Sequence, residues 1–241
     1  MNFMRKSITS VLFLLAMLIG PPHFSRGAQN DAPRPPAPTL VHPATASKAP
    51  NADGFIQRWL ILEPIKNSGQ LTDTAVQTAV KTEYFPNQLD VMPRDGNAVT
   101  VAGSELHWHA VDTINYNVNL YHFAYALKQP TSNVLFWIVT VVNAPRDLNG
   151  VRLAIGSNAA SVWWVNGEQV IGIYNDRQAV VDDGVSKRLA LKKGSNIIRA
   201  AVINAGGATD FCARFLGEDG NPVKGITVSL ESSGGTNAKP Q

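Results

Sequence analysis

The sequence predicts an all-β protein, a two-sheet antiparallel β-sandwich with one short helix. Short apolar runs alternate with tight turns along most of the chain, as sandwich strands do. Asn166-Gly167 stands between two such runs and is the strongest short-range signal for a two-residue hairpin. Lys192-Lys193-Gly194 separates the runs 189–191 and 197–202 in the same manner. These turns favour antiparallel hairpins over a helical fold.

The other elements follow from local patterns. The apolar and aromatic run 55–62 ends at Glu63-Pro64, which predicts a buried strand closed by a proline turn. Behind Thr72, apolar residues at spacings of three and four predict a short amphipathic helix over 71–80. Further strands are expected at 98–101, 105–111, 118–127, 134–142 and 151–155.

The N-terminal residues have the pattern of a secretory leader. Basic residues precede the apolar run 11–19, and small residues lead to Gly27, which predicts a signal peptide over residues 1–27. The mature protein is then exported, either to the periplasm or beyond the cell, with no transmembrane segment. An uncleaved N-terminal anchor is the alternative.

Composition sets the expected domain limits. Residues 28–51 are rich in proline and poor in large apolar residues, so a disordered linker is expected there. The polar segment 232–241 is expected to be a disordered tail. One β-sandwich domain should therefore occupy residues 52–231.

The charge balance of the chain bears on its possible partners. The chain has 21 Lys and Arg against 18 Asp and Glu. Three of the basic residues lie in the predicted signal peptide, so the mature chain is formally neutral and a nucleic-acid partner is not expected.

Cys212 is the only cysteine, which excludes an internal disulfide. Its alternation with charged neighbours predicts a buried side chain, and a reactive or intermolecular thiol is the alternative.

A series of motifs resembles a known family. The series consists of Gly156-Ser157, Trp164-Val165-Asn166-Gly167, Arg177, Asp183 and Leu191-Lys192-Lys193-Gly194-Ser195-Asn196, opened by Arg58-Trp59-Leu60-Ile61-Leu62 and closed by Arg214-Phe215. The chain thereby resembles the secreted jelly-roll modules of the galactose-binding-like (carbohydrate-binding-module-like) superfamily. Such modules are attached to bacterial polysaccharide-degrading enzymes or stand alone as exported proteins. The resemblance covers most of residues 54–230 and implies carbohydrate binding.

One departure from that family changes the expected site. Relatives commonly carry Asp-Asp-Gly after Gly-Ser, whereas this chain has Asn158-Ala159-Ala160. Two carboxylates that would coordinate calcium or accept bonds from sugar hydroxyls are therefore missing. We expect no calcium-assisted sugar site at this turn.

Ligand-binding residues are expected at two places. Trp163 and Trp164 are adjacent in a strand and must point to opposite faces. The resemblance places Trp164 in the core, which leaves Trp163 as a platform for a sugar ring or as a residue covered by a loop. Tyr174, Asn175, Asp176 and Arg177 bring a ring, an amide, a carboxylate and a guanidinium to one loop. The alternative for this loop is a solvated turn.

Two groups of residues resemble catalytic or metal-binding motifs, but structural roles explain them better. His107 and His109 share a strand face and would need a third ligand, Asp112 or His122, to hold zinc. A half-exposed strand with Trp108 facing inward explains them better. The adjacent carboxylates of Asp182-Asp183 diverge on a strand and cannot flank one glycosidic bond. No nucleophile elbow, phosphate loop or zinc-protease motif occurs, so neither enzyme activity nor a cofactor or metal is expected.

The sequence therefore favours an exported, non-catalytic module whose partner is a polysaccharide or another glycan. A scaffold that docks an exported enzyme or a cell-surface protein through an apolar outer face is the first alternative. An accessory hydrolase with an unrecognised site is the second.

Overall fold

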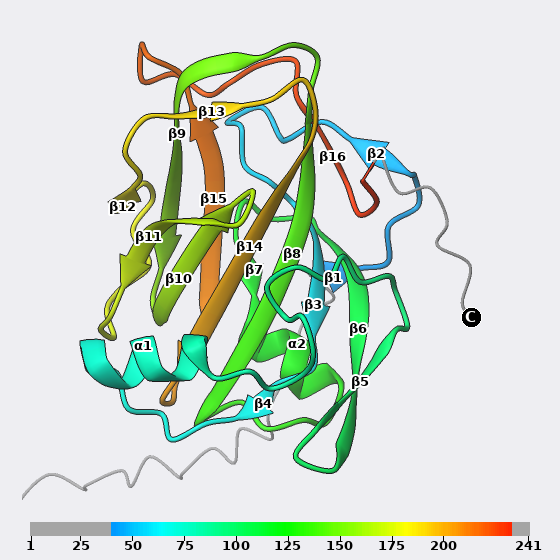
Figure 1. The fold of residues 1–241 in the computed structure, drawn as a ribbon, viewed down its shortest axis with the longest axis vertical. Coiled ribbons are helices and arrows are strands. Elements are labelled where there is room, and N and C mark those ends of the chain that lie inside the picture. The colour runs from blue at the N-terminus through cyan, green and yellow to red at the C-terminus, as the bar shows by residue number, and fades with distance from the viewer. Residues whose placement is uncertain (1–39, 233–241) are drawn as a thin grey trace, which may run out of the picture. The chain divides into compact units, whose positions relative to one another are not determined.

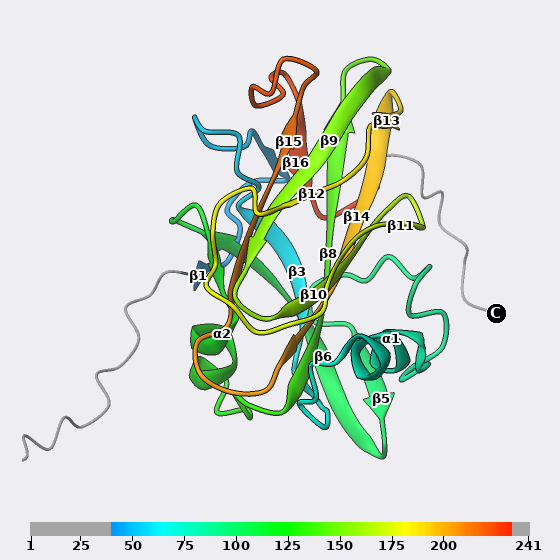
Figure 2. The same ribbon diagram turned by 90° about the vertical axis from the view of Figure 1, so that its left-hand side faces the viewer.

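The structure is a computed structural model that describes residues 40–232. The predicted signal peptide, residues 1–27, and all but the first residue of the predicted tail lie outside the described residues. Within residues 40–232 the strands form two antiparallel sheets (Figures 1 and 2). This confirms the predicted all-β, two-sheet arrangement.

The larger sheet is centred on two long strands, β8 and β14, which pair along their whole lengths. Its strands, in spatial order, are β1 (Leu40–Val41), β6 (Ser104–Thr113), β3 (Arg58–Leu62), β8 (Val134–Ala144), β14 (Gly194–Asn204), β10 (Ala160–Val165) and β11 (Glu168–Ile173). The short strands that attach beside this path are β2 (Ser47–Lys48), β4 (Ile65–Lys66), β5 (Ala98–Val101) and β16 (Thr227–Ser229). Strand β11 is therefore an edge of the sheet.

The smaller sheet faces the inner side of the larger one. Its strands, in order, are β12 (Gly184–Val185), β9 (Leu148–Ser157), β15 (Asp210–Leu216) and β7 (Val118–Asn119), with β13 (Leu189–Leu191) paired to β9. The predicted turn at Lys192-Lys193 is present, but β13 and β14 do not form a hairpin. Because β13 pairs with β9 while β14 pairs with β8 and β10, this turn carries the chain from one sheet to the other.

The hairpin at Asn166-Gly167 is confirmed. Both residues have positive φ, 51° and 85°, as a two-residue turn between twisted strands requires. The side chain of Asn166 adds two bonds: its Oδ1 accepts from the backbone N of Ile197 at 2.9 Å, and its Nδ2 donates to Asn196 Oδ1 at 3.0 Å. The turn is thus fixed to the neighbouring strand β14.

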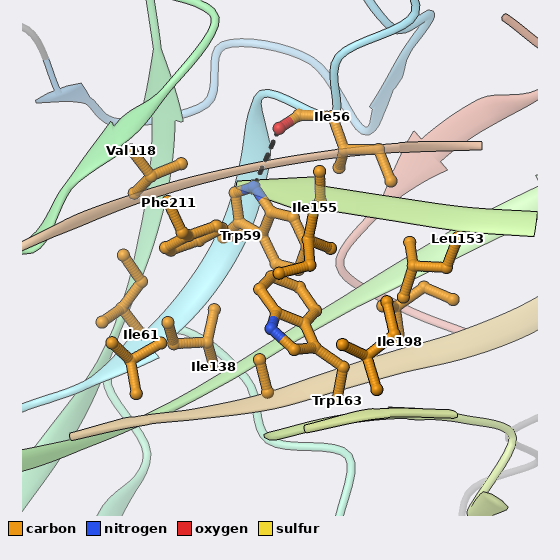
Figure 3. Packing of buried hydrophobic residues seen from close by; sticks show 14 of the residues in the cluster. Ile56, Trp59, Ile61, Val118, Ile138, Leu153, Ile155, Trp163, Ile198 and Phe211 are labelled. Atoms are coloured by element: carbon orange, nitrogen blue, oxygen red, sulfur yellow. Dashed lines mark hydrogen bonds between the residues drawn. The ribbon is translucent and has the colours of Figure 1, made fainter. Parts of the chain in front are cut away.

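An aromatic core fills the space between the sheets (Figure 3). Trp59, Trp163 and Phe211 meet edge to face, with ring centroids 5.2 to 6.1 Å apart. The indole N–H of Trp59 donates to the carbonyl of Ile56 at 2.9 Å, so no polar atom of that ring is left unsatisfied. Burial of three large rings is a main source of stability for the sandwich.

A second apolar cluster lies on the outer face of the larger sheet, beneath helix α1 (Asp73–Lys81). The helix packs Val76 and Val80 against sheet residues that include Trp137 and Trp164. Thr72 caps the helix, with its Oγ1 accepting from the backbone N of Ala75 at 3.3 Å. The predicted amphipathic helix is therefore confirmed.

The expected strand 118–127 is wrong after its first two residues. Strand β7 ends at Asn119, and helix α2 (Leu120–Ala126) follows. Asn119 caps this helix, because its side-chain oxygen accepts from the backbone N of His122 at 2.7 Å. Leu120, Phe123 and Ala124 occupy the buried face at helical spacing. Residues 40–232 thus contain two short helices rather than the one expected.

The structure also corrects the expected start of the folded domain. Residues 40–51 were expected within the disordered linker 28–51, yet β1 pairs with β6 and β2 pairs with β16. The buried guanidinium of Arg58 donates to the carbonyl of Thr45 at 2.7 Å. Residues 40–51 are therefore part of the folded domain. In residues 40–232, neither helix has the length and apolar character to cross a membrane.

Candidate functional site

Most of the expected loop residues line one depression at an edge of the sandwich. Tyr174, Asn175 and Arg177 form part of a hollow of about 680 Å³, together with Asp183 and Lys187. Strand β11 ends the larger sheet and β12 ends the smaller one, so this hollow lies where the edges of the two sheets approach (Figure 1). We call it the rim depression. Asp176, the remaining residue of the loop, is exposed and does not line it.

An ion pair between Arg177 and Asp183 forms the polar centre of the rim depression. The two side chains are 28% and 38% exposed, so they are held in position yet remain open to a ligand. The backbone N of Arg177 donates to the carbonyl of Asn158 at 3.0 Å, which anchors the loop. Arg177 Nε is buried and has no hydrogen-bond partner within the described part of the chain. The pair presents fixed donors and acceptors at one place.

The neighbouring carboxylate points elsewhere. Asp182 accepts from Arg214 Nε at 2.9 Å, and this hydrogen bond raises the pKa of Arg214. Asp183 instead pairs with Arg177. Asp182 and Asp183 diverge as expected, but they do so in a turn, where Asp182 has a φ of 59°, and not on the expected strand. Each carboxylate is held by its own arginine.

Tyr174 forms a wall of the rim depression rather than a free stacking surface. Its hydroxyl accepts from Gln77 Nε2 at 2.5 Å and from Gln169 Nε2 at 3.4 Å. The ring crosses Gly172, where an added Cβ would lie 2.1 Å from the Tyr174 hydroxyl. Only glycine therefore permits this position of the ring, which packs partly against the outer apolar cluster.

The expectation that Trp163 forms an aromatic platform is wrong. Trp163 has no exposed surface, and its indole N–H donates to Ser161 Oγ at 3.0 Å in the inter-sheet core. Trp164 points to the other face, where α1 and the following segment leave it 7% exposed beside Trp137. The two rings do alternate as expected. Which of them enters the core depends on which face of β10 meets the second sheet. The expectation placed Trp164 there, whereas Trp163 occupies that position.

The sequence reasoning missed a second hollow beside Trp164. Leu89, Asp90, Trp164 and Arg199 are among the residues that line this space of about 460 Å³. Arg199 is 3% exposed, and its Nη2 donates to the carbonyl of Val91 at 2.7 Å. Burial lowers the pKa of Arg199 to about 10, an effect that the charge of Asp90 opposes. The sequence contains one signal for this hollow, because Arg199 is the only charged residue in the apolar run 197–203.

In strand β6, Trp108 faces inward between the two histidines, as expected. Trp108 is 1% exposed, while His109 Nε2 lies 3.2 Å from Glu63 Oε1 and His107 Nε2 lies 3.3 Å from Glu105. Asp112 pairs with Arg58 instead, at 2.8 Å. Among residues 40–232 no group of three acidic, histidine or cysteine side chains is placed to hold a metal ion.

The pKa values of Asp95 and Asp219 are both lowered. Burial raises the pKa of Asp95, but a hydrogen bond from the backbone N of Ala110 and the proximity of His42 lower it overall. Bonds from the side chain and backbone of Asn221 lower the pKa of Asp219. A general acid at neutral pH needs the opposite shift.

Comparison with known proteins gives weak likenesses alone. No family model and no curated protein matches the chain. The solved structures that resemble it include the PA14 sugar-binding domain from an RTX adhesin (TM-score 0.43, 13% identity, 75% of this chain and 100% of that one), the PA14 domain of the antifreeze protein MpAFP (0.36, 13%, 67% and 82%), and a beta-glucosidase from Kluyveromyces marxianus in complex with glucose (0.38, 19%, 52% and 16%). The match thus spans 16% of the glucosidase chain. At these TM-scores the likenesses assign neither a family nor a ligand to this protein.

Proposed function

We propose that this protein is an exported, non-catalytic module that binds a carbohydrate in the rim depression. The observation that carries the proposal is the Arg177–Asp183 pair, which stands beside the Asn175 amide and the Tyr174 ring in one hollow. The proposal of export depends on the amino-acid sequence of residues 1–27.

The chemistry of the depression suits sugar hydroxyls, each of which both donates and accepts. Asp183 offers acceptors, Arg177 offers donors and Asn175 offers both. Because the ion pair has no net charge, it favours an uncharged polar ligand over an anion. The loop is already held by the bond between Arg177 and Asn158, so binding does not have to order it.

The arrangement of carboxylates supports binding without hydrolysis. A glycosidase needs two carboxyl groups on either side of one bond, one of them protonated when the reaction begins. Asp73 and Asp183 are the carboxylates that line the rim depression, and Asp183 is already engaged in the ion pair with Arg177.

A glycan array with the purified protein tests this proposal, followed by calorimetry on each glycan that binds. Arg177→Gln and Asn175→Ala should each weaken binding about tenfold, corresponding to about 1.4 kcal/mol. Asp176→Asn is the matched control, because this exposed residue of the same loop lies outside the depression and its change should leave affinity unaltered. An empty array, or affinities that Arg177→Gln and Asn175→Ala leave unchanged, would refute the proposal.

A further inference from the structure

The rim depression continues along the whole of strand β11. A second hollow of about 500 Å³ is lined by residues 168–170 on one side and residues 187–190 on the other. Val170 and Lys187 line both hollows, so the two adjoin. One wall of the combined space is β11 and the other is the segment 183–190, which includes β12 and the start of β13. We call this combined space the rim groove.

The rim groove is longer than one sugar ring. Strand β11 has six residues, and a strand rises about 3.3 Å per residue, which gives a wall of roughly 20 Å. The strand and the segment containing β12 run beside each other in both views of the ribbon (Figures 1 and 2). Several linked rings therefore fit where a monosaccharide would fill one end.

Charged groups of both signs are distributed along this length. The Arg177–Asp183 pair stands at one end, Lys187 lies at the junction of the two hollows, and Glu168 lies in the second hollow. Among the described residues, neither Lys187 nor Glu168 has an ion-pair partner, and both are exposed. An uncharged oligosaccharide, which carries hydroxyls on every sugar ring, would find hydrogen-bond donors and acceptors along the whole groove.

The edge of β11 is poorly suited to the other extended ligand, a peptide strand. Trp164 pairs with Gln169 and Trp163 pairs with Ile171, which leaves Val170 as an extra residue in a β-bulge. A bulge breaks the regular spacing of edge N–H and C=O groups that an added strand requires. Recognition through side chains is therefore favoured over strand addition.

We propose that the rim groove binds a linear, uncharged oligosaccharide along its length rather than a single terminal sugar. This inference rests on the proposed carbohydrate-binding function and extends it to a chain-type ligand. It assigns Lys187 and Glu168 as contacts for sugar units that lie beyond the Arg177–Asp183 pair.

Calorimetry with cello-, xylo- and manno-oligosaccharides, from dimer to hexamer, tests the inference on the full chain. For the series that binds, affinity should rise at least tenfold from dimer to hexamer. Glu168→Gln should weaken hexamer binding several-fold and leave dimer binding unchanged, because Glu168 lines the second hollow alone. Lys187→Ala should weaken hexamer binding more than dimer binding, because Lys187 lines both hollows. Asn175→Ala should weaken both, and Asp176→Asn should weaken neither. Because all four side chains are exposed, these variants are expected to fold.

The outcomes separate this inference from the proposed function. Equal affinity for dimer and hexamer, with no effect of Glu168→Gln or Lys187→Ala, overturns the groove and leaves binding at the rim depression intact. If no oligosaccharide binds and the glycan array is also empty, both proposals are wrong. If an extended hexapeptide of alternating Thr and Val binds and the oligosaccharides do not, the groove accepts a peptide strand and the inference is overturned.

Discussion

Trp163 belongs to the core, and its substitution should therefore affect stability directly. Its ring is fully buried against Trp59 and Phe211. Trp163→Ala should lower the free energy of unfolding by about 3–5 kcal/mol, through lost contacts and the remaining cavity. Urea denaturation measures this change. Ile114→Ala is the control, because Ile114 is 66% exposed and its truncation should change stability by less than about 0.5 kcal/mol. Equal midpoints for the two variants would show that Trp163 is not a core residue.

Cys212 is buried, as the sequence indicated, and its thiol should make stability depend on alkaline pH. Burial raises the pKa of this thiol from 9.0 to about 11. The folded state therefore keeps a proton that the unfolded state loses above pH 9. The stabilising contribution of the protonated thiol is complete below pH 9 and is lost as pH rises towards about 11. At that pH the loss of stability amounts to about 2 kcal/mol.

Urea denaturation from pH 8 to pH 11 checks this dependence in the wild type and in Cys212→Ala. The wild type should lose about 2 kcal/mol more than the variant across this range. Comparison with the variant removes the contributions of lysine and tyrosine, which also titrate there. Parallel losses in the two proteins would show that the Cys212 thiol is not shifted.

The side chain of Asn196 connects two turns of the chain by hydrogen bonds. Its Oδ1 accepts from the backbone N of Lys192 at 2.9 Å and from Asn166 Nδ2 at 3.0 Å. Its Nδ2 donates to the carbonyls of Lys192, Gly194 and Val142, at 2.8 to 3.3 Å. One fully buried amide thereby connects the β10–β11 turn, the β13–β14 turn and β8.

Asn196→Ala should cost about 2–4 kcal/mol of stability, because it leaves several buried backbone groups without partners. Thermal or urea unfolding measures the loss, and Asn175→Ala is the control because Asn175 is exposed. The same amide holds one end of the hairpin that forms the rim groove. A stability change no larger than that of Asn175→Ala would mean that water replaces these bonds.

Elements with a strong local signal could be predicted from the sequence, and elements set by tertiary contacts could not. Positive φ at Asn166 and Gly167 fits the Asn-Gly pair, and Thr72 marks the start of α1. Helix α2 was mistaken for a strand because its aromatic and apolar residues also fit a strand. The pairing of β13 with β9 rather than with β14 depends on residues far away in the sequence. Local turn chemistry cannot reveal such a partner.

The candidate site was predictable in part for the same reason. Tyr174, Asn175 and Arg177 were found because a loop gathers them within four positions. Asp183 and Lys187 reach the same hollow through the fold, and Arg199 enters its own hollow from a central strand. The face of β10 that carries Trp163 is fixed by its register with β14, where Trp163 lies opposite Ala200.

Residues 40–51 should contribute to the stability of the domain as a whole. Arg58 is 1% exposed and donates to Thr45 as well as to Asp112, and β1 and β2 both pair with other strands. A protein that begins at residue 52 should therefore be less stable than one that begins at residue 40, by at least about 2 kcal/mol, because a buried guanidinium loses a partner and two strands are lost. Chemical denaturation of both proteins measures the difference. Equal stabilities would restore the limit at residue 52 that composition predicted.

The pairing of β8 with β14 determines when the molecule can fold. Val134 pairs with Asn204 and Ala144 with Gly194, so the central strand of the sandwich receives this neighbour only after residues 194–204 have been synthesised. A nascent chain that ends earlier leaves the apolar residues of β8 open along one edge, a surface prone to aggregation. Native structure should therefore appear only after residues 194–204 have left the ribosome.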